Sequence, residues 1–221
     1  MKKLPLLFAG SLFCLILLAG CSPQQSDFKE KTYSADTAGI SAVNIDVKDR
    51  KINISPSSDD QIHITYHENE KEFYDITTKD STLSMQTETD KEAKDFFGKN
   101  ASLEDRTIDL SIPDSLISSL KISTTNENIN LPSLSITDSV SAYANNGSIT
   151  FESLAVGKSI QLETKNGSIS GTVVGGYDDF LITSNIKKGE STLPEQAGNG
   201  TKTLNVKVNN GDIQIDFQKS R

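Results

Sequence analysis

The sequence predicts an all-β fold, a repetitive parallel β-solenoid-like stack of about 20-residue units preceded by a β-sheet region or by degenerate repeats. Three observations predict it. A short phrase returns along the second half of the chain, apolar residues recur there at a constant step, and apolar and polar residues alternate within each unit. Alternation is the period of a strand with one buried face, and the apolar spacing typical of a helix is absent.

The returning phrase begins with asparagine and ends with isoleucine, at Asn126, Asn146, Asn166 and Asn210. At a step of 20 residues, the first three copies form apolar columns: Leu120, Val140, Ile160; Ile122, Ala142, Leu162; Ile129, Ile149, Ile169; and Leu134, Leu154, Val174. A fourth copy extends the first two columns with Phe180 and Ile182. After about four inserted residues around Lys187 to Gly200, the pattern resumes at Leu204, Val206 and Ile213. Such a period indicates stacked units that bury their apolar faces against one another.

The Asn-Gly steps at the repeat turns leave two strand arrangements open. Asn-Gly between alternating runs is a strong signal for a type I′ hairpin, which would give an antiparallel meander. The constant columns favour a parallel solenoid instead, with Asn126, Asn146 and Asn166 as a ladder at one corner. We predict structural turn roles for six residues, with the glycines supplying positive φ: Asn146, Gly147, Asn166, Gly167, Asn210 and Gly211.

The first twenty residues have the layout of a secretory signal, with a basic head, an apolar run and small residues before Cys21. The ending Leu18-Ala19-Gly20-Cys21 resembles the lipobox of bacterial lipoproteins. This resemblance implies cleavage after Gly20 and acylation of the Cys21 sulfur; the alternative is an ordinary cysteine near a plain cleavage site. The expected divisions are therefore a signal peptide (1–20), a lipidated cysteine and flexible tether (21–36), an N-terminal β region (37–112) and the repeat solenoid (113–221).

Composition excludes several function classes. The formal net charge of −8 becomes −10 in the expected mature chain, because Lys2 and Lys3 leave with the signal. A chain this acidic is not expected to bind nucleic acid or anionic lipid through general electrostatics. Cys14 leaves as well, so neither a disulfide framework nor a cysteine metal site is expected, and we expect no cofactor.

Short alternating runs occupy residues 40–112, divided by turn-rich segments. The twenty-residue columns are unclear here, so this region is either a set of decayed repeats or a sheet that caps the solenoid. Asp90 to Arg106 interrupts the pattern with dense charge, and we expect a long loop or a short helix. Its Phe96 and Phe97 are expected to fold onto the sheet rather than to contact a membrane or partner.

Signals for catalytic and metal sites are weak. His63 and His67 lie on the polar face of one expected strand, where four residues separate them by roughly 13 Å, too far for one ion. Asp178 and Asp179 follow two glycines, yet calcium loops of β-solenoids need aspartates in consecutive units, so we expect a charged turn. The sequence contains no nucleophile elbow, phosphate loop or zinc-protease motif.

The run from Ile117 to Ile215, with its successive Asn-Gly-Ser-Ile phrases, resembles the bacterial β-strand-repeat family of adhesin-like proteins of unknown function. The resemblance covers about residues 40–217 and implies a β-solenoid-like stack with no known active site. Some members of this family occur in envelope-stress systems. Two segments depart from the pattern, because Glu127 stands where the repeat has glycine and Asn185 to Gly189 breaks the fourth unit.

Two function hypotheses follow. The first is a non-enzymatic, lipid-anchored scaffold on the extracytoplasmic face of the cell membrane, whose exposed Asn, Ser, Thr and Lys residues contact an envelope protein or glycan. The alternative is a polysaccharide-acting enzyme, because a solenoid can carry paired carboxylates on one face. The scaffold is favoured, since tryptophan is absent and the acids of the repeats share no column: Glu152, Glu163, Asp178 and Asp179.

Overall fold

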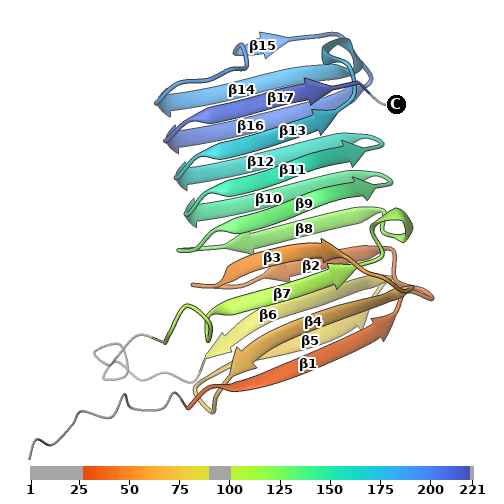
Figure 1. Ribbon diagram of the computed structural model, residues 1–221, viewed down its shortest axis with the longest axis vertical. Helices are drawn as coiled ribbons and strands as arrows, with labels where there is room; N and C mark the ends of the chain where they lie inside the picture. The colour runs from red at the N-terminus through yellow and green to blue at the C-terminus, as the bar shows by residue number, and fades with distance from the viewer. Residues whose placement is uncertain (1–26, 90–100, 220–221) are drawn as a thin grey trace, which may run out of the picture.

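The computed structural model describes residues 27–89 and 101–219 (Figure 1). Within these ranges the chain forms seventeen strands and two short 3₁₀ turns, η2 (Asp114–Leu116) and η3 (Tyr177–Asp179). The strands are β1 (Lys29–Asp36), β2 (Ala42–Asp46), β3 (Lys51–Pro56), β4 (Gln61–Glu68), β5 (Glu72–Lys79), β6 (Thr82–Thr89), β7 (Thr107–Ile112), β8 (Ser119–Thr124), β9 (Ile129–Ile136), β10 (Ser139–Asn146), β11 (Ile149–Val156), β12 (Ser159–Asn166), β13 (Ile169–Val174), β14 (Phe180–Lys188), β15 (Gln196–Ala197), β16 (Lys202–Asn210) and β17 (Ile213–Gln218).

Two sheets face each other and enclose the core. Sheet A has the strand order β1-β4-β7-β3-β9-β11-β13-β17, and sheet B has the order β15-β14-β16-β12-β10-β8-β2-β6-β5. One strand from each sheet makes one level of the stack, as β10 and β11 do, and strands of neighbouring levels run parallel through the repeats (Figure 1). The predicted all-β, solenoid-like stack is therefore confirmed, and the hairpin alternative is wrong for the repeats.

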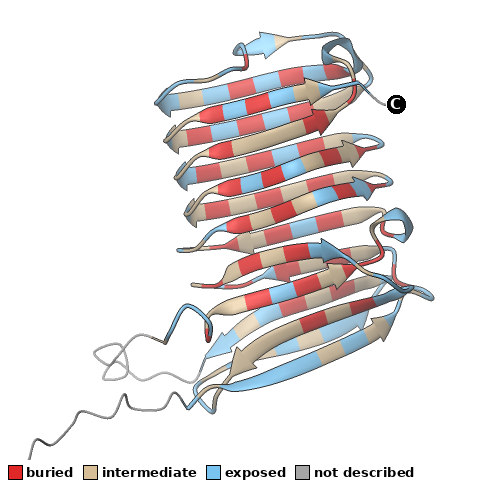
Figure 2. Cartoon of the chain, in the orientation of Figure 1, coloured by how far each residue is buried: buried red, intermediate tan, exposed pale blue. Residues whose placement is uncertain are grey.

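The step of 20 residues places equivalent apolar side chains on neighbouring strands. Val140 lies opposite Leu120 and Ile160, and Ile149 lies opposite Ile129 with Ile169 on its other side. Buried apolar residues alternate with exposed polar ones along the strands, so the red bands in Figure 2 line up from level to level. One cluster of buried residues runs through the described chain from Ile40 to Ile215, because each level buries its apolar residues between its neighbours.

The order of the last levels differs from the prediction that Phe180 and Ile182 continue the columns as a fourth copy. β16 lies between β12 and β14, so Leu204 is opposite both Ile160 and Ile182. The C-terminal strands therefore stack directly on β12 and β13, and β14 lies outside them. The depth differs as well, because Ile182 aligns with Leu204 and Ile160 in the first column, whereas the prediction placed it in the second. The prediction was wrong because alternation fixes the face of a residue, while the order of the levels and the register of the fourth copy depend on contacts between distant segments. The Phe180 ring of β14 packs on Phe217 of β17, at 5.9 Å between ring centroids. This contact joins β14 of sheet B to the last strand of sheet A.

A similar insertion occurs at the other end of the repeats. β2 lies between β6 and β8, and β3 lies between β7 and β9. Val43 is consequently opposite Leu120, and Asn130 of β9 bonds to Asn53 of β3 although the two asparagines are 77 positions apart. Residues of the N-terminal β region thus join the parallel stack, while β1, β4 and β5 add antiparallel strands at its end. The predicted tether (21–36) is therefore wrong for Lys29–Asp36, which pair with β4 as strand β1.

Several predictions concern residues outside the described ranges. The signal peptide, acylated Cys21, Phe96 and Phe97 lie there and stay predictions. The described end of the charged segment, residues 101–106, forms turns in which the Asp105 carboxylate accepts a hydrogen bond from the Ser102 hydroxyl at 2.7 Å. Within 27–89 and 101–219, no helix is long and apolar enough to cross a membrane.

Candidate functional site

One corner of the stack carries a line of exposed asparagine side chains. Nδ2 of Asn210 donates to Oδ1 of Asn166, Asn166 donates to Asn146, and Asn146 donates to Asn126, at 2.6 to 2.7 Å. Asn126 donates in turn to the Asp49 carboxylate, which belongs to the inserted N-terminal level. All the side-chain amides therefore point the same way, and the charged Asp49 carboxylate is the last acceptor of the series. In such a series each hydrogen bond polarises and strengthens its neighbours.

The glycines that follow these asparagines are required by crowding between levels. A Cβ added at Gly147 would lie 2.1 Å from the Glu127 carbonyl oxygen, and one added at Gly167 would lie 2.2 Å from that of Gly147. The predicted positive φ is found at Gly167 (+154°) and Gly211 (+140°), whereas Gly147 does not have it. The prediction is therefore wrong for Gly147, where the close backbone of the level below excludes a side chain. Glu127 is itself accommodated because its carboxylate pairs with Arg106.

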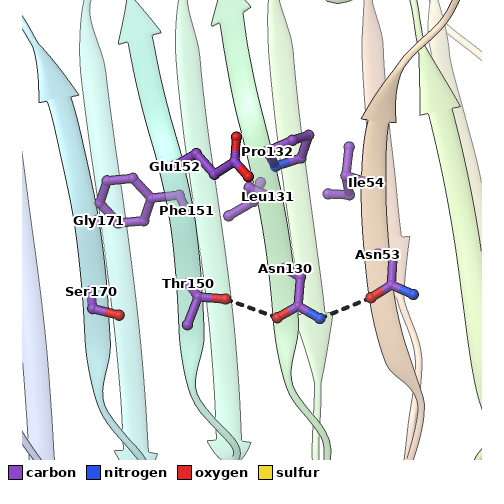
Figure 3. A pocket seen from close by; sticks show the side chains of 10 residues that line it. All are labelled: Asn53, Ile54, Asn130, Leu131, Pro132, Thr150, Phe151, Glu152, Ser170 and Gly171. Carbon is purple, nitrogen blue, oxygen red and sulfur yellow. Dashed lines mark hydrogen bonds between the residues drawn. The ribbon is translucent and has the colours of Figure 1, made fainter.

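Sheet A opens where β3 meets β9, and the opening forms a groove of about 350 Å³ (Figure 3). The pairing of β3 with β9 covers Ile52 with Ile129 and Asn53 with Asn130. Pro132 follows two residues later in β9, and it has no N–H with which to continue the ladder. The two strands therefore separate beyond Asn130, and the groove lies over this separation.

A β-bulge shapes the other side of the groove. The register between β11 and β13 shifts between Thr150 and Leu154, so that β11 holds one residue more than β13. Phe151 packs at this point against Gly171, where an added Cβ would lie 2.4 Å from a ring carbon. Gly171 thus leaves the space that the aromatic ring of Phe151 fills.

Hydrogen-bonding side chains form one wall of the groove (Figure 3). Thr150 Oγ1 donates to Asn130 Oδ1 and Asn130 Nδ2 donates to Asn53 Oδ1, both at 2.8 Å. Asn53 Nδ2 donates in turn to Asp109 of β7, so this ladder also ends at a carboxylate. Among the described residues that line the groove, Glu152 alone is charged. The groove can therefore receive a small polar group, which a single carboxylate and neutral amide and hydroxyl groups would contact.

Glu152 and Asp109 do not form the carboxylate pair that glycoside cleavage needs. Glycosidases generally place two carboxyl groups roughly 5 to 9.5 Å apart. Glu152 lies in β11 and Asp109 in β7, three strand positions away in sheet A. At about 4.8 Å for each strand, these two carboxylates are separated by roughly 14 Å or more.

The two histidines of β4 have separate partners. His63 Nδ1 lies 2.9 Å from the Ser34 hydroxyl, and its Nε2 lies 3.0 Å from the Asp59 carboxylate. Hydrogen bonds from Ser57 and from His63 hold the pKa of Asp59 below its usual value. His67 lies 4.0 Å from Glu30. In the part of the chain that the structure describes, no group of three or more His, Cys, Asp or Glu side chains is placed to hold a metal ion.

The buried cation Arg50 was not predicted from the sequence. Its side chain is 2% exposed, Nε donates to the Tyr74 hydroxyl, and the guanidinium pairs with Glu72 at 2.9 Å. Burial raises the pKa of Tyr74. These contacts join the turn between β2 and β3 to β5, so Arg50 stabilises the N-terminal end of the stack. No local sequence signal distinguishes this arginine from a solvated one.

The fold and its polar corners define a β-solenoid-like repeat protein with two facing sheets. Residues 40–220 match the family model described as Toastrack DUF4097, and the chain belongs to this family. The resemblance found in the repeats is thereby confirmed. A comparison with curated proteins finds no match.

Solved structures of other bacterial proteins resemble this chain. A candidate cell adhesion protein from Clostridium sporogenes is 15% identical, with a TM-score of 0.59, and the match covers 86% of this chain and 100% of that one. A candidate adhesin from Bacteroides fragilis is 13% identical, with a TM-score of 0.37, covering 85% of this chain and 97% of that one. The first likeness shows a shared fold.

Proposed function

We propose that the protein is a non-enzymatic, lipid-anchored scaffold on the extracytoplasmic face of the membrane that binds an envelope component in the manner of an adhesin. The observation that carries the proposal is that polar side chains form rows across the outer faces of the sheets. Ser119, Ser139, Ser159 and Thr203 lie in register on four neighbouring strands of sheet B. Hydroxyl groups repeated at the strand spacing of about 4.8 Å suit an extended partner that can bond at several levels.

Other observations support parts of this proposal. The lipobox-like ending before Cys21 supports a lipid anchor, and the name of the Clostridium structure supports an adhesive role. The family resemblance also motivates a role linked to envelope stress. The separation of Glu152 from Asp109 disfavours the polysaccharide-acting enzyme that was the alternative.

The anchor is tested by Cys21→Ala in the producing bacterium. The native chain is expected in the membrane fraction, whereas the variant should be released and should migrate differently on electrophoresis because it lacks acyl chains. A Cys21→Ala protein that stays in the membrane fraction with unchanged mobility would contradict acylation.

Binding is tested by co-sedimentation of the purified protein with isolated envelopes. Gln161→Glu with Asn205→Glu places two acids at adjacent exposed positions of sheet B, and Gln214→Glu with Gln218→Glu places two acids on the exposed face of β17 in sheet A, one on each side of Asp216. Loss of co-sedimentation in one pair and not in the other would identify the binding face. Equal binding by both pairs and by the native protein would refute a role for the stack faces.

A further inference from the structure

The outer face of sheet B carries a positive excess although the whole chain has a formal net charge of −8. From β8 to β14, the charged side chains that alternate with the buried residues, and so point outward, are four lysines and one acid: Lys121, Lys165, Lys187, Lys207 and Glu163. The next two strands of the sheet, β2 and β6, add the outward acids Asp46 and Glu88. We call this surface the lysine face. Glu163 is paired with Lys207 at 2.8 Å, which leaves a balance of three positive charges between β8 and β14 and of one when Asp46 and Glu88 are included. The net charge of the chain therefore does not describe this surface. The expectation that the acidic chain does not attract anionic partners does not apply to the lysine face.

Sheet A has the opposite balance. From β7 to β17, its outward charged residues in the described strands are Lys51 against Asp109, Glu152 and Asp216. The stack thus separates charge between its two faces. An anionic ligand would be attracted to sheet B and repelled by sheet A, which fixes the side from which it approaches.

Two lysines of the lysine face flank one asparagine. Val208 and Asn210 of β16 are in register with Thr164 and Asn166 of β12 and with Ile186 and Lys188 of β14. Asn209 consequently lies between Lys165 and Lys187. The two lysines are two strand positions apart, roughly 10 Å between their backbones, and both are exposed.

Unsatisfied acceptors lie beside these lysines. Oδ1 of Asn209 is buried and has no hydrogen-bond partner among the described residues, and the same holds for Oδ1 of Asn44. Asn44 is opposite Lys121 in the neighbouring strand. Both oxygens are closed to solvent, so a ligand on this face reaches them only when the asparagine side chain turns outward. A donor on the ligand would then recover the free energy that an unpaired buried acceptor costs. The face therefore combines cations with acceptors that require a hydroxyl or amide donor.

We propose that the lysine face binds a hydroxyl-bearing polyanion, either an acidic glycan or a polyol phosphate. Its anionic groups would contact Lys121, Lys165 and Lys187, and its hydroxyl groups would donate to the asparagines. A membrane surface fits less well, because of the large apolar side chains exposed in the described chain only Leu181 lies on this face, and insertion needs an apolar surface. The inference rests on the proposed function, for which it names the class of ligand.

The test uses purified protein and defined polymers. Polygalacturonate supplies carboxylates, poly(glycerol phosphate) supplies phosphates, and dextran is the neutral control. The triple variant Lys121→Gln, Lys165→Gln, Lys187→Gln removes three charges from the lysine face. The matched control, Lys29→Gln, Lys31→Gln, Lys79→Gln, removes three exposed lysines from β1 and β5 at the far end of the stack.

The native protein is expected to bind at least one acidic polymer and not dextran, and added salt should weaken the binding. Neutralising the lysine face should lower the affinity roughly tenfold, since exposed ion pairs contribute modestly, and the control triple should bind as the native protein does. The polymer that binds identifies the anionic group. Thermal melting checks that both triples remain folded, and Lys165→Gln with Lys187→Gln should show an intermediate loss.

Three results would overturn the inference: no binding to either acidic polymer, equal loss in both triple variants, or binding to phosphatidylglycerol vesicles or duplex DNA without binding to the polymers. Each leaves the anchored scaffold untouched, because that proposal is judged by fractionation of Cys21→Ala and by envelope co-sedimentation. Conversely, a soluble Cys21 variant that still binds polymer would separate the ligand class from the anchor.

Discussion

Gly167→Ala tests the close stacking of the repeat corner. The added methyl group would lie 2.2 Å from the Gly147 carbonyl oxygen and 2.9 Å from the Ser148 amide nitrogen, so the two levels must separate. Overpacking of this kind costs about 1 to 3 kcal/mol, and a non-glycine residue at positive φ costs about 1 kcal/mol more. Separation would also break the bonds of Asn166 to Asn146 and Asn210, at about 1 kcal/mol each. We expect a total loss of about 4 to 6 kcal/mol in the free energy of unfolding.

Urea and thermal unfolding measure this loss, and Gly39→Ala is the matched control. Gly39 also has positive φ, at +87°, but an added Cβ would meet nothing within 4 Å. The control should lose about 1 to 2 kcal/mol from backbone strain alone. For a chain of this size each kcal/mol lowers the melting temperature by about 2 to 4 °C, so the two variants should be well separated. If Gly167→Ala is no less stable than Gly39→Ala, crowding between levels is not what selects glycine at the corner.

Two other predictions concern stability. Ile149→Asp places an unpaired charge at a position that is 0% exposed, between Ile129 and Ile169, and should cost more than about 4 kcal/mol, whereas Thr150→Asp at the neighbouring exposed position should cost about 1 kcal/mol. Equal melting of these two variants would remove Ile149 from the core. Because burial raises the pKa of Tyr74 above its unfolded value, the native protein keeps this contribution below about pH 10 and loses it as the pH rises through the folded pKa. Tyr74→Phe should therefore show a shallower loss of stability above pH 10 in urea titrations, and an unchanged slope would contradict the assignment.

The repeat columns predicted most of the register of the stack because they carry both periods of the fold. The column of Leu134, Leu154 and Val174 is wrong at its last member, because the β-bulge in β11 places Val173 opposite Leu154. Alternation gives the face of each residue, and the 20-residue step gives its neighbour in the next level, so the pairing of Ile129 with Ile149 follows from the sequence. The asparagine ladder follows as well, since Asn126, Asn146 and Asn166 share that step.

Features that depend on contacts between distant segments were not predictable in this way. The insertion of β2 and β3 under the repeats joins Asn53 to Asn130 across 77 positions, and no constant step marks it. The burial of Arg50 depends on Tyr74 and Glu72, which approach it only in the folded stack. Pro132 indicates an interrupted strand pairing, because proline cannot donate a ladder hydrogen bond. The sequence did not show that β3 is the strand from which β9 separates there, so the groove could not be predicted.

The net charge of the chain does not reveal the lysine face, because it sums the charges of both sheets. Net charge adds the acids of sheet A to the lysines of sheet B, and only the strand pairing shows that Lys165 and Lys187 lie on one surface. Local charge balance on a sheet face, rather than net charge, thus decides which ligands a flat repeat protein can attract.

Lysine footprinting on native envelopes would test the central claim most directly. Isolated native envelopes that contain the protein are treated with an amine-acylating reagent, and labelling of each lysine is compared with labelling in the purified protein. Bound ligand should protect Lys121, Lys165 and Lys187, while Lys29, Lys31 and Lys79 at the far end should label equally in both samples. Protection confined to the far-end lysines, or no protection at all, would contradict a scaffold that binds the envelope through sheet B.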